Sequence, residues 1–185
     1  LREFIKAHVP RGDNAEALYR IEHGRIRPSK MLADSLAGML RGNTEFVLVD
    51  DQKVVYETCL AKAGLATADR KQVVIVSGGP GTGKSVVAIN LIVALTKKGL
   101  LSKYVSKNAA PRAVYAQKLR GHQRNVEISG MFGGSGNFFE TNPNTFDTLV
   151  VDEAHRLNEK SGLYGNLGEN QIKELIAAAK CTILF

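Results

Sequence analysis

The chain has 185 residues, of which 44% are hydrophobic and 23% charged, and its formal net charge is +7. A chain of this size and composition folds as one domain, or as one domain with a small appendage, which excludes a disordered tail or a disulfide-stapled miniprotein. No apolar run reaches the ~20 residues that cross a bilayer, and the N-terminus lacks the pattern of a signal peptide. We therefore expect a cytoplasmic protein without a membrane partner, with Cys59 and Cys181 as reduced core residues.

The positive charge is concentrated in one segment. Eight basic residues and no acidic residue lie between Lys97 and Arg124, so this segment carries +8 and the rest of the chain sums to −1. A basic segment of this kind is typical of proteins that bind a polyanion.

The N-terminal part of the chain predicts a small helical appendage over residues 1–44. Apolar residues recur at helical spacing between Met31 and Leu40, and Gly42 is expected to end that helix. Residues 46–49 predict a short strand. Asp50 is expected to cap a helix over residues 51–63, with Gly64 just past its end.

Strands and helices then alternate through the expected main domain, residues 45–185. The strands are apolar throughout, which indicates a mostly parallel sheet covered on both faces, an α/β fold. The predicted strands cover residues 72–77, 101–106, 148–152 and 182–185, and the predicted helices cover residues 84–98, 111–120 and 169–179.

A glycine-rich motif predicts a phosphate-binding loop. It follows the first of these strands, precedes an apolar helix and satisfies GxxxxGK[ST]. The glycines let backbone N–H groups approach a phosphate, while the lysine reaches the β- and γ-phosphates and the serine hydroxyl ligates Mg²⁺. We expect ATP and Mg²⁺ as ligands, with the loop formed by Gly78, Gly79, Pro80, Gly81, Thr82, Gly83, Lys84 and Ser85.

A second motif, Thr148 to His155, is an apolar strand that ends in two adjacent carboxylates. Asp152 is expected to hold Mg²⁺ through its water shell, and Glu153 to orient the water that attacks the γ-phosphate. A carboxylate directly after the metal aspartate favours a hydrolase over a kinase. An acidic pair at the end of a strand is often only a solvated turn. Because this pair occurs together with the glycine-rich loop, it predicts hydrolysis of ATP.

Together the two motifs resemble the first RecA-type lobe of superfamily 1 helicases. The runs KNAAPRAVY and TFDTLVVDEAHRLNEKSGLYGNLGENQIKEL resemble the bacterial Schlafen-related P-loop family of helicase-like ATPases. The resemblance extends from about Phe46 to Phe185. It implies a RecA-like three-layer sandwich with catalytic roles for Lys84 and Glu153. It also implies that His155 couples the γ-phosphate site to nucleic acid or to a second lobe, unless it is an ordinary helix N-terminal histidine.

Two further assignments rest on the resemblance. Gln52 resembles the glutamine that reads the edge of adenine, although it could instead be an exposed residue at a helix start. The segment after the second core strand corresponds to a single-strand contact motif, in which Lys107, Asn108 and Arg112 would bind phosphates and Tyr104 or Tyr115 would stack on bases. The alternative for this basic segment is a solvated surface.

Two glycine-rich stretches have no predicted nucleotide role. Residues 131–139 are expected to form a flexible surface loop, with Phe138 and Phe139 packed against the core or another domain. Residues 162–168 are expected to form a mobile loop near the active site.

The sequence thus predicts the ATP-binding and hydrolysing lobe of a helicase-like ATPase that associates with single-stranded DNA or RNA. Family members of this type need a second RecA lobe that supplies an arginine. We expect that lobe in a longer protein, and slow hydrolysis by these 185 residues alone. The alternative is a P-loop switch ATPase that regulates a protein partner without nucleic acid; a kinase is disfavoured by Glu153.

Overall fold

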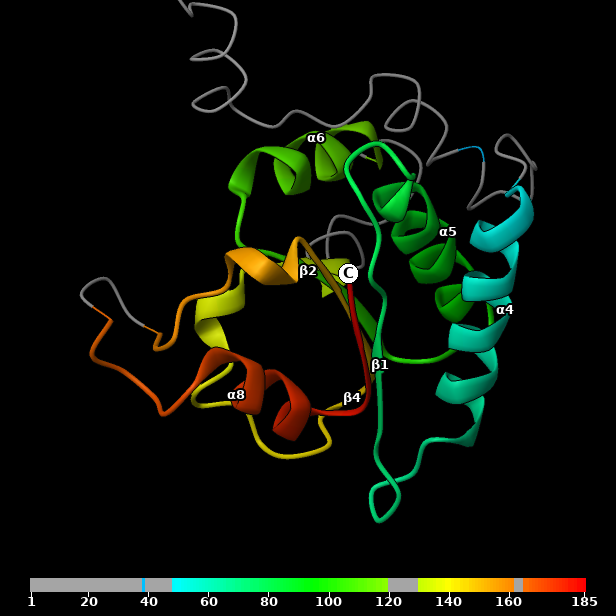
Figure 1. Ribbon diagram of the computed structural model, residues 1–185. Helices are drawn as coiled ribbons and strands as arrows, with labels where there is room; N and C mark the ends of the chain where they lie inside the picture. Colours follow the sequence, from blue (N-terminus) through cyan, green and yellow to red (C-terminus); the bar gives the residue numbers. More distant parts are fainter. Residues whose placement is uncertain (1–37, 39–47, 120–129, 162–164) are drawn as a thin grey trace, which may run out of the picture.

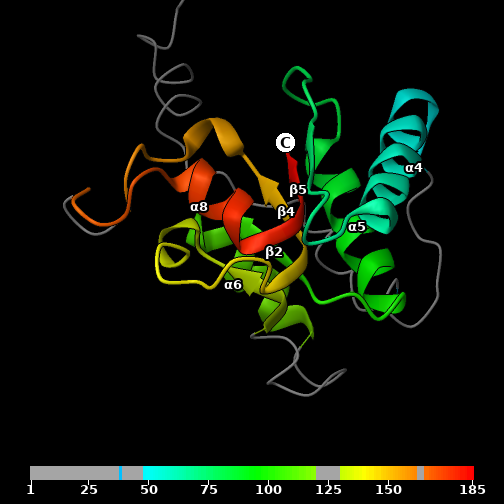
Figure 2. The same ribbon diagram turned by 90° about the horizontal axis from the view of Figure 1, so that it is seen from below.

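The fold is a parallel sheet covered by helices, as the sequence predicted. A computed structural model describes residue 38 and residues 48–119, 130–161 and 165–185. Within these ranges the strands pair in the spatial order β1-β5-β4-β2-β3, and every pairing is parallel (Figures 1 and 2). The strands are β1 (Gln72–Ile75), β2 (Ser102–Ser106), β3 (Phe132–Gly133), β4 (Phe146–Asp152) and β5 (Ala179–Leu184).

Helices lie on both faces of this sheet and give the RecA-like three-layer arrangement. Helices α5 and α6 cover one face, α4 packs on α5 beside β1, and α8 covers the opposite face (Figure 2). None of the helices in the described ranges combines the length and apolar character needed to cross a membrane. The helices are α4 (Asp50–Leu65), α5 (Lys84–Lys97), α6 (Ala109–Leu119) and α8 (Gln171–Ala178), with single turns of 3-10 helix at η1 (Ser135–Asn137) and η2 (Ala154–Arg156).

Strand β4 shows why the strands are apolar throughout. Val150 belongs to the core beneath α4, α5 and α6, whereas Leu149 and Val151 belong to the core beneath α8. Successive side chains of a strand point to opposite faces, so a strand buried on both sides needs apolar residues at every position. By the same alternation, Asp152 lies on the α5 side of the sheet.

Most predicted elements are present, with ends shifted by a few residues. The prediction of a strand over residues 46–49 is wrong for Leu48 and Val49, which precede α4 without pairing to a strand. Gly64 lies inside α4 rather than past its end, because the helix continues to Leu65. The N-terminal appendage and its boundary at residue 44 lie outside the described residues, apart from Gly38, which is helical.

The stretch 131–139 differs from the predicted flexible surface loop. It contains β3 and η1, and Met131, Phe132 and Phe138 are buried. Phe132 packs against two tyrosines of the core, with ring centroids 5.7 Å from Tyr104 and 5.9 Å from Tyr115. Burial of Phe138 confirms that this phenylalanine packs inward, whereas Phe139 is only partly buried; the apolar side chains outweigh the glycines in determining this segment's structure.

A lysine side chain joins the start of β1 to the end of α8. The Lys71 ammonium donates hydrogen bonds to the carbonyls of Ile176 (3.0 Å), Ala177 (2.9 Å) and Ala179 (2.7 Å). Carbonyls at a helix C-terminus lack partners within the helix, and a cation there also interacts favourably with the helix dipole.

We predict that Lys71→Met lowers the free energy of unfolding by about 2 kcal/mol, because charge-assisted hydrogen bonds are lost while the aliphatic stem is retained. Urea unfolding measures the change. Lys53→Met removes an exposed lysine of α4 and should change stability by less than about 0.5 kcal/mol. Equal effects of the two substitutions would contradict the proposed anchoring of α8.

Candidate nucleotide site

The predicted nucleotide motifs meet at the carboxyl edge of the sheet. The glycine-rich loop follows β1, the acidic pair ends β4, and β5 lies between these two strands. Strands lie about 4.8 Å apart, so β5 leaves a gap of about 10 Å between the end of β1 and the end of β4. Ligands of parallel α/β sheets bind at this edge. An open cleft of about 740 Å³ occupies the gap, and its lining includes Gly78, Lys84, Glu153, His155 and Phe185.

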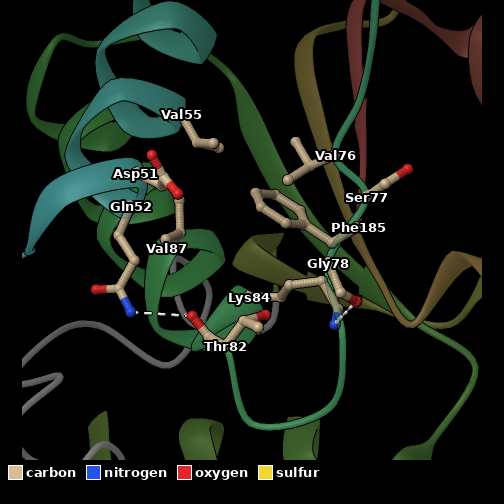
Figure 3. A pocket seen from close by; sticks show the side chains of 10 residues that line it. All are labelled: Asp51, Gln52, Val55, Val76, Ser77, Gly78, Thr82, Lys84, Val87 and Phe185. Atoms are coloured by element: carbon tan, nitrogen blue, oxygen red, sulfur yellow. Dashed lines mark hydrogen bonds between the residues drawn. The ribbon is translucent and has the colours of Figure 1, made fainter.

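The glycine-rich loop has free hydrogen-bond donors. No described group accepts a hydrogen bond from the backbone N–H groups of Gly79, Gly81 or Thr82. The Lys84 ammonium donates to the carbonyls of Gly78 (2.6 Å) and Gly79 (2.8 Å), which holds it over the loop (Figure 3). Unpaired N–H groups, an ammonium and the N-terminus of the 14-residue helix α5 together make a site suited to an anion.

Gln52 supports this loop from α4. Its amide Nε2 donates to the carbonyl of Thr82 at 2.9 Å, and its Oε1 accepts a long hydrogen bond of 3.5 Å from the N–H of Val49 (Figure 3). Gln52 also lines a smaller cavity of about 200 Å³, together with Val55, Val87 and Phe185. The glutamine predicted to read adenine therefore lies beside a cavity at the loop, with its amide bound to the loop backbone.

Asp152 links the acidic strand to the loop. It is 5% exposed, and its Oδ2 accepts hydrogen bonds from the Ser85 hydroxyl at 2.9 Å and from the Tyr104 hydroxyl at 2.6 Å. Its Oδ1 accepts from the N–H of Glu153 at 3.0 Å. The two residues expected to hold Mg²⁺ are thus in direct contact, and oxygen atoms of this type are the ligands that Mg²⁺ prefers.

This pair fits Mg²⁺ only as part of a nucleotide complex. Within the described residues, no group of three or more His, Cys, Asp and Glu side chains could hold a metal ion. Mg²⁺ in phosphoryl-transfer sites usually has one or two protein ligands, together with phosphate oxygens and waters. Ser85 and Asp152 supply such a set beside the loop.

Glu153 has a different environment from its neighbour. Its backbone is left-handed, with φ 56° and ψ 44°, at the junction between β4 and η2. Its carboxylate lies 3.1 Å from Nε2 of His155 and 3.7 Å from Nε of Arg156, and its side chain is 26% exposed. A left-handed residue with a side chain costs about 1–2 kcal/mol, and such strain is concentrated at functional sites. Glu153 therefore faces the cleft with two basic neighbours.

The described cations of the basic segment lie at both edges of the sheet. Lys97 ends α5 and Lys98 follows it, before the start of β2, whereas Lys107 follows the end of β2, at the opposite edge of the sheet. Lys103 lies between them, half-buried, with its ammonium 5.2 Å from the centre of the Phe146 ring, and burial lowers its pKa. Arg120 and Arg124 lie outside the described residues, as does the side chain of Lys118.

The three residues predicted to bind nucleic acid differ in accessibility. Lys107 is exposed, and its ammonium donates to Oδ1 of Asn158 at 2.7 Å. Arg112 is half-buried against Gly134, its Nε donates to the carbonyl of Asn108 at 3.1 Å, and burial lowers its pKa. Lys107 is therefore the more available of the two cations.

The prediction that tyrosines of this segment stack on bases is wrong. Tyr104 is 0% and Tyr115 is 1% exposed, and their rings pack edge to face with centroids 5.9 Å apart. Two contacts of the site had no sequence signal: the bond from Tyr104 to Asp152, and the approach of Arg156 to Glu153. The first depends on how β2 and β4 are paired, which the sequence alone does not give.

Comparison with known proteins agrees with this geometry. Residues 71–185 match the family described as Schlafen group 3, DNA/RNA helicase domain. The match spans the glycine-rich loop, the acidic pair and all the described strands. No curated protein matches the chain.

Two glycines of the loop allow a test of the contact with Gln52. Gly81 (φ 77°) and Gly83 (φ 86°) are both left-handed. A Cβ at Gly83 would lie 2.5 Å from Nε2 of Gln52, whereas one at Gly81 would meet nothing within 4 Å. We predict that Gly81→Ala costs about 1–2 kcal/mol of stability from backbone strain alone, and that Gly83→Ala costs more because it also displaces Gln52.

Urea unfolding of both variants measures this difference. In the Gln52→Ala background the difference between the two glycine substitutions should disappear, because the side chain that clashes is absent. Equal costs in the presence of Gln52 would show that the glutamine does not restrain the loop.

Proposed function

The chain belongs to the Schlafen group 3 helicase-domain family, and from this membership and the geometry of the cleft we propose that it binds and hydrolyses ATP with Mg²⁺. The observation that carries the proposal is the hydrogen bond between Ser85 and Asp152. It joins the glycine-rich loop to the acidic strand, at residues that are next in sequence to Lys84 and Glu153, which line the cleft. A phosphate group, a metal ion and an attacking water would therefore meet in one place.

Binding of the triphosphate would use donors already present in the loop. The N–H groups of Gly79, Gly81 and Thr82 would donate to phosphate oxygens, aided by the dipole of α5. Lys84 would exchange the carbonyls of Gly78 and Gly79 for the β- and γ-phosphates. The adenine would enter the smaller cavity beside Gln52, and the glutamine would have to release the Thr82 carbonyl to read it.

Ser85 and Asp152 would hold Mg²⁺ between them. The ion, when bound, neutralises charge on the phosphates and stabilises the charge that develops as the γ-phosphate is transferred. Ser85 would present its oxygen to the metal while its hydroxyl still donates to Asp152. Asp152 would orient a metal-bound water through its free lone pairs.

Glu153 would orient and activate the attacking water. Glu153 lines the cleft, and its carboxylate contacts His155 and Arg156, so part of its hydrogen-bonding capacity is already used. His155 would couple this carboxylate to nucleic acid or to a second lobe. An arginine from such a lobe is often worth ~10³ or more in rate, so the 185 residues alone should hydrolyse ATP slowly.

Nucleic acid would bind along the edge that carries Lys107. This lysine is exposed at the carboxyl end of β2 and contacts Asn158, which follows η2 and the acidic pair. A phosphate that displaces Asn158 from Lys107 would therefore act on the segment after Glu153. Asn108 and Arg112 would contribute less, because the arginine is half-buried.

A second candidate function is a P-loop switch that regulates a protein partner. Division of the basic segment between two edges of the sheet favours it, because no continuous track of exposed cations connects Lys98 with Lys107 in the described residues. Burial of Tyr104 and Tyr115 favours it as well, because neither ring is available to stack on a base.

The nucleotide proposal predicts different results for two substitutions in the cleft. Lys84→Ala should abolish ATP binding, because the cation that faces the phosphates is lost. Glu153→Gln should bind ATP normally but hydrolyse it at least ~100-fold more slowly, since it removes a general base. Equilibrium dialysis measures binding, and release of phosphate at saturating ATP measures turnover.

Glu159→Gln is the matched control, because Glu159 is an exposed glutamate outside the residues that line the cleft. It should leave binding and turnover unchanged. Loss of ATP binding in Glu153→Gln would mean that Glu153 is a structural residue or a metal ligand rather than the base.

The nucleic-acid proposal predicts a local effect of charge. Lys107→Ala should weaken binding of a single-stranded oligonucleotide and reduce the salt dependence, by about 0.7 in the slope of log K against log salt for one lost phosphate contact. Lys98→Ala removes an exposed lysine at the edge of the sheet opposite Lys107, and it should change neither the affinity for the oligonucleotide nor its salt dependence. Fluorescence anisotropy at several salt concentrations measures both. Absence of salt-sensitive binding by the unmodified chain would favour the regulatory candidate.

A further inference from the structure

We propose that Tyr104 is a positioning residue for magnesium, which fixes the Asp152 carboxylate before the metal arrives. This role rests on the proposed binding of ATP with Mg²⁺. Tyr104 lies in the middle of β2, the strand next to β4, and it is 0% exposed. It cannot touch nucleotide or nucleic acid, and its one polar contact among the described side chains is with Asp152.

The hydrogen bond has the geometry of a strong, charge-assisted contact. The Tyr104 hydroxyl donates to Oδ2 of Asp152 at 2.6 Å, whereas the Ser85 hydroxyl donates to the same oxygen at 2.9 Å. Hydrogen bonds from a hydroxyl to a carboxylate are typically about 2.5–2.7 Å long and about twice as strong as those between neutral groups. Tyr104 is thus the closer of the two hydroxyl donors.

The phenol is held in place before any ligand binds. Its ring packs edge to face against Tyr115 and Phe132, with interplanar angles of 86° and 61°. A donor held rigidly in this way restricts the rotation of the carboxylate that it binds.

The lone pairs of the Asp152 carboxylate show how much of its hydrogen-bonding capacity remains for a metal-bound water. A carboxylate offers about four lone-pair sites, two on each oxygen. Tyr104 and Ser85 occupy both sites of Oδ2, and the N–H of Glu153 occupies one site of Oδ1. One site, on Oδ1, is left to accept a hydrogen bond from a metal-bound water. Tyr104 therefore determines which oxygen of Asp152 serves the metal.

The alternative is that Tyr104 only fills space in the aromatic cluster. Tyr115 separates the two roles, because it is equally buried, packs against the same Phe132 ring and is not among the donors to Asp152. Replacing either tyrosine by phenylalanine removes one buried hydroxyl and keeps the ring. Only the substitution at 104 removes a hydrogen bond from the candidate metal site.

The test is the Mg²⁺ dependence of nucleotide binding by the 185-residue chain, measured with a fluorescent, non-hydrolysable ATP analogue. In Tyr104→Phe the Mg²⁺ concentration that gives half-maximal binding should rise about 10-fold or more, as is typical when the hydrogen-bond partner of a metal ligand is lost. In Tyr115→Phe it should be unchanged. Circular dichroism and urea unfolding check that both variants fold.

A second background tests whether the effect of Tyr104→Phe acts through Asp152. In the Asp152→Asn background, adding Tyr104→Phe should not change the Mg²⁺ dependence further, because the carboxylate that Tyr104 orients is already absent. An equal rise in both backgrounds would overturn the proposal.

The outcomes also separate this role from the proposed function. If the unmodified chain binds the analogue in a Mg²⁺-dependent way and Tyr104→Phe behaves identically, only the positioning role is overturned. If the unmodified chain shows no Mg²⁺-dependent binding, the proposed function fails and the role of Tyr104 fails with it.

Discussion

Burial of the Asp152 carboxylate is the constraint on which the candidate site depends. A buried carboxylate is costly unless hydrogen bonds compensate for the lost water, and here three donors from three parts of the chain do so. Ser85 belongs to the first turn of α5, Tyr104 to β2, and the N–H of Glu153 to the turn after β4. Satisfying one charge therefore fixes the phosphate loop, the neighbouring strand and the acidic turn relative to one another.

The position of β5 sets the width of the cleft next to Asp152. Because β5 lies between β1 and β4, the loop and the acidic turn cannot pack directly against each other, and Phe185 at the end of β5 lines the gap. Helix α5 contacts both β2 and β4 on one face of the sheet, which lets Ser85 reach Asp152 across the intervening strand. The cleft thus lies open between the loop and the acidic turn, and the hydrogen bond from Ser85 to Asp152 connects these two parts of the chain.

Sequence patterns predicted the parts of this arrangement that depend on local periodicity. An apolar strand followed by a glycine-rich turn predicted β1 and the loop. An apolar strand followed by an acidic pair predicted β4 and Asp152. The family match covers both segments. The expectation that Tyr104 stacks on bases failed because a strand buried on both faces leaves no exposed position for a ring. Among the described cations of the basic segment, Lys98 and Lys107 lie at opposite edges of the sheet, since the five residues of β2 between them span about 16 Å; contact of this segment with nucleic acid stays a prediction. Pairing between strands, which brings Tyr104 to Asp152, has no signature in either segment alone.

The adjacent carboxylates acquire different environments because the strand ends between them. Asp152 is still in β4, so the alternation of side chains directs it to the α5 face, where it is buried and accepts three hydrogen bonds. A regular strand would direct the next residue to the α8 face, but the backbone at Glu153 is left-handed; Glu153 lines the cleft, and its side chain is 26% exposed beside two basic groups. The two environments suit two chemical roles: a fixed, buried anion can hold a metal-bound water, whereas an accessible carboxylate with partners that can exchange can accept a proton. In the proposed reaction, the left-handed backbone at Glu153 would therefore allow the two neighbouring acids to serve different steps.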